Sequence, residues 1–161
     1  MIPSLLLIHV VISLVGIASG VVVVYGLLGG KSNGGWTATF LATTVLTSLT
    51  GLPLPATQLL PSHIITFISL LLLVAAIVAL YVYHLAGAWR WIYVVTAMTA
   101  LYLNVFVGVV QAFQKLTFLQ PLAPSQLEPP FVAAQLAALV LFVALGVLAV
   151  RRFHPEVKAV I

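Results

Sequence analysis

The stretch PSLLLIHVVISLVGIASGVVVVYGLL, residues 3 to 28, carries no charged side chain and consists almost entirely of aliphatic and small residues. A helix needs about 20 apolar residues to cross the roughly 30 Å hydrocarbon core of a bilayer. At a rise of 1.5 Å per residue, this stretch would form a helix of about 39 Å. It therefore predicts a membrane-spanning helix and limits the class of protein that the rest of the chain can form.

The composition of the whole chain agrees with this interpretation. The 161 residues are 63% hydrophobic and 5% charged, with a mean hydropathy of +1.29, whereas soluble domains contain about 25% charged residues. The sequence pI of 9.8 arises from only six Lys and Arg residues without a basic stripe, so we exclude nucleic acid as a partner. The chain has no cysteine, which excludes disulfides, thiolate metal sites and thiol catalysis.

Clusters of Gly, Pro and polar residues divide the chain into apolar segments, because these residues interrupt helices. We predict an all-α, polytopic integral membrane helix bundle that forms a single domain over residues 1–161. Its five transmembrane helices are expected near residues 3–28, 36–52, 62–85, 89–115 and 130–151. The connection HLAGAWR, residues 84 to 90, predicts a tight hairpin with Gly87 in a left-handed C-cap conformation.

The distribution of cations predicts the orientation of the bundle. The second segment, residues 36–52, would form a helix of about 25 Å, slightly shorter than the hydrocarbon core. If it crosses the membrane, Lys115 lies on one side and the other cations lie on the opposite side, namely Lys31, Arg90, Arg151, Arg152 and Lys158. Since cytoplasmic loops carry the excess of Lys and Arg, the N-terminus is expected outside and the C-terminus inside.

Polar side chains within the apolar segments are expected to face other helices or a cavity. The first segment has a helical face of polar and small residues, formed by His9, Ser13, Gly16 and Gly20. With the predicted orientation, the polar groups of the other segments also gather in the outer half of the bundle, about 7–18 Å from the helix ends. We predict a polar pocket there, whose ligand-binding residues are His9, Ser13, Thr47, Thr50, Asn104, Gln111 and Gln135.

Three interpretations of this polar cluster remain open. The first is that its groups only hold helices together through interhelical hydrogen bonds, which contribute about 0.6 kcal/mol each. The second is a b-type haem with His9 and His63 as axial metal ligands, which would make the chain an electron-transfer protein. The third is a site for a small neutral ligand, a quinone or a lipid. A proton path and hydrolysis are disfavoured, because neither an intramembrane carboxylate nor a nucleophile motif is present.

We therefore expect a non-catalytic binding or accessory subunit rather than an enzyme. Its expected partners are membrane lipid and either other subunits of a membrane complex or further copies of the chain. The two Pro-rich connections on the outer side, residues 53–61 and 116–129, are the predicted docking surface for such partners.

A resemblance supports the membrane assignment without suggesting a reaction. The stretches GWTATFLATTVLTSLTG (35–51), YHLAGAWRWIYVVTAMTALYLNVFVGVVQAFQK (83–115) and PPFVAAQLAALVLFVALGVLAVRRF (129–153) resemble a group of small five-span bacterial inner-membrane proteins of unassigned function. The resemblance covers most of the chain. It implies a location in the cell inner membrane, and it carries no activity and no site residues.

Overall fold

The computed structural model describes residues 3–31, 34–52 and 59–154, and these residues form five long α-helices and no strand. The long helices are α1 (Pro3–Leu28), α2 (Gly34–Gly51), α3 (Leu59–Ile77), α4 (Trp89–Lys115) and α5 (Pro129–Arg152). A short π-helix, η1 (Val78–Val82), continues α3, and a 3₁₀ helix, η2 (Gln120–Leu122), lies between α4 and α5.

Four of these helices are long and apolar enough to cross a membrane: Ser4–Leu28, His63–Val82, Trp89–Lys115 and Pro129–Arg152. The predicted all-α membrane bundle is confirmed at this level. With η1 counted as the end of the third helix, the predicted helix boundaries differ from the observed ones by at most three residues, because Gly and Pro mark most of the ends. The exception to the simple pattern is the third segment, where the α-helix stops at Ile77 and η1 replaces its last turn.

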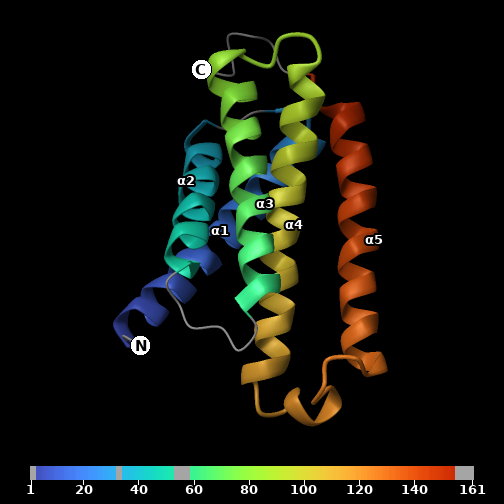
Figure 1. Cartoon of the computed structure of the whole chain (residues 1–161). Helices are drawn as coiled ribbons and strands as arrows, with labels where there is room; N and C mark the ends of the chain where they lie inside the picture. The colour runs from blue at the N-terminus through green and yellow to red at the C-terminus, as the bar shows by residue number, and fades with distance from the viewer. Residues whose placement is uncertain (1–2, 32–33, 53–58, 155–161) are drawn as a thin grey trace.

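Successive helices run in alternate directions, so the chain ends and connections gather at two ends of the bundle (Figure 1). One end holds the α1–α2 and α3–α4 connections and the end of α5, and with them Lys31, Arg90, Arg151 and Arg152. We call the half of the bundle next to it the basic half, and the other half, which contains Lys115, the distal half. Lys158 lies outside the described residues.

The hydrophobic core occupies the basic half and extends to the middle of the bundle. Its largest fully buried side chains include Phe40, Leu73, Tyr93, Leu101 and Phe153, which come from α2, α3, α4 and the residue after α5. On α4 the contrast is clear, because most residues between 93 and 101 are buried, whereas residues 102–110 are all half-buried. The bundle is therefore tightly packed at the basic end and more open at the distal end.

Glycines allow α1 to approach its neighbours closely. α1 makes its most extensive contacts with α2 and also packs on α4 and α5. A Cβ added at Gly20 would lie 2.6 Å from Leu101 Cδ1 and 3.0 Å from the Phe40 ring, so only glycine fits between these buried side chains. This is the small-residue contact that membrane helices use for close packing, as the sequence pattern predicted.

The side chain of Arg90 connects the start of α4 to the end of α5. Its guanidinium donates hydrogen bonds to the carbonyl oxygens of Val150, at 2.6 Å, and of Phe153, at 2.8 Å. The last carbonyls of a helix have no partner within the helix, so a basic side chain at this position satisfies them. Phe153 is fully buried and packs on the Tyr93 ring, which fixes the end of α5 on the core.

The turn between η1 and α4 differs from the simple C-cap that was predicted. Gly87 adopts the expected left-handed conformation, with φ of 55°. The helix itself, however, ends with two consecutive left-handed residues, His84 (φ 50°) and Leu85 (φ 61°), and the Leu85 N–H donates to the Ala79 carbonyl at 2.9 Å. Buried Leu85 packs in the core, which holds this uncommon backbone conformation in place.

Candidate functional site

The candidate site is a seam of polar groups where α1, α2 and α4 meet. It extends from the middle of the bundle to the distal end. We define this polar seam as His9, Ser13 and Gly16 of α1, Thr43, Thr47 and Thr50 of α2, and Asn104 of α4.

At the distal end of the seam, His9 contacts Thr50, as the predicted cluster requires. The Nδ1 atom of His9 lies 2.9 Å from the Thr50 hydroxyl oxygen, and the ring also lies against Gly51, where an added Cβ would be 3.2 Å from Cε1. The Thr50 hydroxyl donates its proton to the Leu46 carbonyl at 2.7 Å. With the hydroxyl proton on the Leu46 carbonyl, the Thr50 oxygen accepts from the His9 tautomer that carries its proton on Nδ1, and in that tautomer Nε2 is an acceptor.

Near the middle of the bundle, Asn104 points its amide toward Gly16. A Cβ added at Gly16 would lie 3.3 Å from Asn104 Nδ2 and 3.3 Å from the Thr43 hydroxyl oxygen. The absence of a side chain at Gly16 thus lets an amide of α4 and a hydroxyl of α2 approach the backbone of α1. Asn104 Nδ2 is buried, and it has no hydrogen-bond partner among the described residues.

The hydroxyl groups of the seam are satisfied by their own helices. Ser13 donates to the Val10 carbonyl at 2.9 Å, and Thr47 donates to the Thr43 carbonyl at 2.8 Å. Their oxygens keep lone pairs and can still accept a hydrogen bond. Ser13 and Thr47 are both half-buried, and they offer acceptors rather than free donors.

The two glutamines do not join the seam. Gln135, on α5, donates from Nε2 to the Phe106 carbonyl of α4 at 3.2 Å, so it lies in the α4–α5 contact. Its Oε1 atom is buried without a hydrogen-bond partner in the described part of the chain. Gln111 is exposed near the end of α4. Sequence periodicity does not define which neighbour each face of α4 meets, so it grouped these amides with residues that they do not contact.

The two histidines proposed as haem ligands come from helices that do not pack extensively on each other. α1, which carries His9, packs on α2, α4 and α5, whereas α3, which begins before His63, packs on α4 and α2. Within residues 3–31, 34–52 and 59–154, no group of three or more His, Asp or Glu side chains could hold a metal ion. Haem binding stays a prediction of the sequence.

Sequence reasoning missed two features, one at the seam and one in the α4–α5 contact. Thr44 also lies against Gly16, with its hydroxyl oxygen 3.4 Å from an added Cβ, and it was left out because it is one residue away from the Thr43 face. The Phe106 carbonyl accepts from Gln135 although helix carbonyls are normally engaged, and no sequence signal identifies it. The sequence signal that does indicate the seam is the repeat of small and polar residues at positions i and i+4.

No protein family, curated protein or solved structure matches the chain in the comparisons.

Proposed function

We propose that the chain is a non-catalytic integral membrane protein, a binding protein or an accessory subunit of a larger membrane assembly, whose binding site lies in the distal half. The observation that carries this proposal is the uneven packing of the bundle. The core fills the basic half, where among the described residues only His84 Nδ1 is a buried polar atom without a partner, whereas beyond the middle of the bundle Asn104 Nδ2 and Gln135 Oε1 both keep hydrogen-bonding capacity that no described residue uses. A buried polar group without a partner costs about 1–3 kcal/mol. A ligand or partner offering hydroxyl or carbonyl groups would remove that penalty.

In this proposal all five long helices cross the bilayer, including α2. Its 18 residues give a length of about 27 Å, close to the hydrocarbon thickness. α2 contains many hydroxyl side chains, which lower its hydropathy. The hydroxyls of Thr39, Thr43, Thr44, Thr47, Ser48 and Thr50 all donate to the carbonyl four residues earlier. Because these groups are satisfied within the helix, the cost of placing α2 in hydrocarbon is small.

The proposed orientation has the N-terminus outside and the basic end on the inside. It is supported by the separation of the described cations, with Lys31, Arg90, Arg151 and Arg152 at the basic end and Lys115 at the other. Such a bias in Lys and Arg is typical of the cytoplasmic side. The distal half then faces the outside. The proposed location is the inner membrane of a bacterial cell, as the resemblance implies.

A non-catalytic role is supported by the hydrogen bonds of the His9–Thr50 pair. A histidine that activates a hydroxyl nucleophile must accept the proton of that hydroxyl. The Thr50 hydroxyl has the Leu46 carbonyl as an acceptor at 2.7 Å, an arrangement that pairs it with the His9 tautomer that donates from Nδ1. In that tautomer Nδ1 does not take the Thr50 proton, and Nε2 acts as an acceptor.

The α4–α5 connection at the distal end supports the role of an accessory subunit. It exposes large apolar side chains, with Phe118 70% and Leu127 81% exposed. The connection is held in shape by Glu128, whose carboxylate accepts hydrogen bonds from the Ser125 hydroxyl at 2.7 Å and from the Leu127 N–H at 3.1 Å. The Ser125 hydroxyl bond lowers the pKa of Glu128 below its ordinary value, so the carboxylate stays ionised at neutral pH. Exposed apolar groups on an ordered loop are suited to docking a partner.

Replacing Asn104 with leucine tests the proposal. We expect at least a tenfold loss of the small molecule or partner subunit that co-purifies with the chain in a mild detergent, because one polar contact of 1.4 kcal/mol corresponds to a factor of ten. Native mass spectrometry of the purified protein measures the retained species. The melting temperature should stay within a few degrees of the wild-type value, because Asn104 Nδ2 has no hydrogen bond to lose among the residues that the structure describes.

The matched control is Thr99→Val, which removes another polar group from α4 in the basic half, where the hydroxyl donates to the Val95 carbonyl of its own helix. This variant should retain the same species as the wild type. Equal retention by Asn104→Leu and the wild type would contradict the proposal, and so would a wild-type protein that retains neither a small molecule nor a partner.

A further inference from the structure

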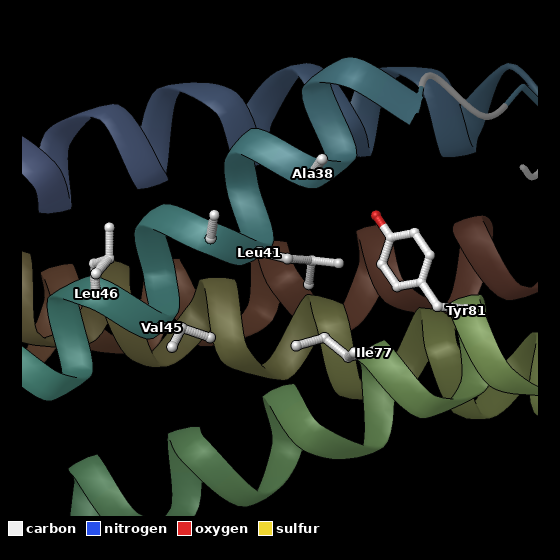
Figure 2. A pocket seen from close by; sticks show the side chains of 7 residues that line it. Ala38, Leu41, Val45, Leu46, Ile77 and Tyr81 are labelled. Carbon is white, nitrogen blue, oxygen red and sulfur yellow. The ribbon is translucent and has the colours of Figure 1, made fainter.

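A groove of about 450 Å³ opens on the side of the bundle between α2 and α3, away from the polar seam. Its wall on α2 is formed by Ala38, Leu41, Ala42, Val45 and Leu46, and its wall on the other side by Ile77 and Tyr81 (Figure 2). Leu46 and Tyr81 are each 46% exposed, so the groove is open to the surroundings of the bundle. The lining is apolar except for one hydroxyl, that of Tyr81, which points toward α2 in Figure 2.

The groove lies on the surface that faces hydrocarbon when α2 and α3 cross the membrane. α2 carries its seam residues on one face and the groove residues on another, so the two sites are separate. Tyr81 belongs to η1, where the N–H of Tyr83 donates to the Val78 carbonyl five residues earlier, at 3.0 Å. Such π-helical turns within an α-helix are frequent at functional sites.

The shape of the groove fits one hydrocarbon chain. From Ala38 to Leu46 it extends along α2 for about 12 Å. An extended acyl chain can lie along this apolar length and contact both walls.

The direction of the groove indicates where the polar head of its occupant lies. Ala38 and Tyr81 are its residues closest to the basic end, and Leu46 lies near the middle of the bundle. At the basic end, Lys31, Arg151 and Arg152 are exposed, whereas the guanidinium of Arg90 is engaged by carbonyls of the end of α5. Exposed cations at a membrane surface attract anionic lipid heads, at about 1 kcal/mol each.

From the shape, the lining and the charge, we propose that this groove binds one acyl chain of an anionic phospholipid, whose head group lies at the basic end. The proposal rests on the membrane placement of α2 and α3, but not on a ligand of the polar seam. The bound lipid would fill the gap between two helices that contact each other much less extensively than α1 and α2 do.

The test uses the full-length chain in nanodiscs of three parts phosphatidylethanolamine to one part phosphatidylglycerol, followed by detergent extraction and native mass spectrometry. We expect the wild type to retain one phosphatidylglycerol per chain. Ala42→Trp places a large ring in the groove from an exposed position and should reduce retention at least tenfold. Ala38→Trp fills the groove from a second position and serves if the first variant does not fold. The matched control is Ala144→Trp on exposed α5, which should retain lipid as the wild type does.

Two further measurements separate this proposal from the proposed binding site at the polar seam. Asn104→Leu, which alters the seam, should retain the lipid normally. Lipid retention in the groove is therefore expected whether or not the seam binds a ligand. Lys31→Gln should reduce the preference for phosphatidylglycerol over phosphatidylethanolamine. The proposal is overturned if Ala42→Trp and Ala38→Trp retain phosphatidylglycerol like the wild type. It is also overturned if the retained species is uncharged, such as a polyprenyl quinone.

Discussion

Replacing Gly20 with valine is expected to destabilise the bundle by about 3 kcal/mol, at the upper end of the usual range for overpacked cores. The Cβ alone would lie 2.6 Å from Leu101 Cδ1, and Phe40 blocks the other side at 3.0 Å. Both of these side chains are almost completely buried, so neither can move without disturbing the core. The extra methyl groups would therefore push α1 away from α2 and α4. Reversible unfolding in mixed detergent micelles measures the change in the free energy of unfolding.

Gly146 on α5 provides the matched control for this prediction. A Cβ at Gly146 meets no atom within 4 Å, so Gly146→Val introduces the same side chain into a membrane helix without a clash. Its free energy of unfolding should remain within about 0.5 kcal/mol of the wild type. Similar losses in the two variants would mean that valine weakens the helices by itself and that the α1 contact is not tight.

Replacing Arg90 with methionine is the second substitution with a large expected effect, a loss of about 3 kcal/mol. The variant keeps most of the side-chain volume but removes both hydrogen bonds to the Val150 and Phe153 carbonyls. Hydrogen bonds from charged groups contribute about 1.5–3 kcal/mol each, and the two share one guanidinium, so their effects do not add fully. The same unfolding assay measures the loss, and hydrogen exchange should increase at the end of α5.

Two further variants distinguish the capping role of Arg90 from its charge. Arg90→Lys keeps the charge but offers a single donor group, so it should recover only part of the stability. Arg151→Met removes an exposed cation from the same end and should change stability by less than 1 kcal/mol. If Arg151→Met is as harmful as Arg90→Met, the charge at the basic end matters and the carbonyl contacts do not.

The helices could be predicted from the sequence because their signals are local. Charge-free apolar stretches bounded by Gly, Pro and Trp gave boundaries close to those of α1, α4 and α5. The interruption of α3 could not be predicted, because η1 is followed by the left-handed residues His84 and Leu85, and leucine does not favour that conformation. Leu85 is held there by burial in the core, which is a tertiary effect.

The candidate site could be predicted only in part. Depth along a helix follows from residue counting, and so His9 and Thr50, which lie at a similar depth on neighbouring helices, were correctly grouped. The direction of a side chain around the bundle depends on how helices cross, and this separated Gln135 and Gln111 from the polar seam. The Arg90 contacts across 60 residues of sequence were missed for the same reason.

The five-span arrangement, with the distal half outside, is the central claim, and single cysteines on either side of α2 test it directly. The chain contains no cysteine, so each introduced thiol is the only one present. In right-side-out vesicles, an impermeant maleimide should label Leu52→Cys and the reference Ser125→Cys. It should label Lys31→Cys and the reference Ala86→Cys only after the membrane is permeabilised. Labelling of Lys31→Cys and Leu52→Cys from the same side would contradict the account, because α2 would then not cross the membrane.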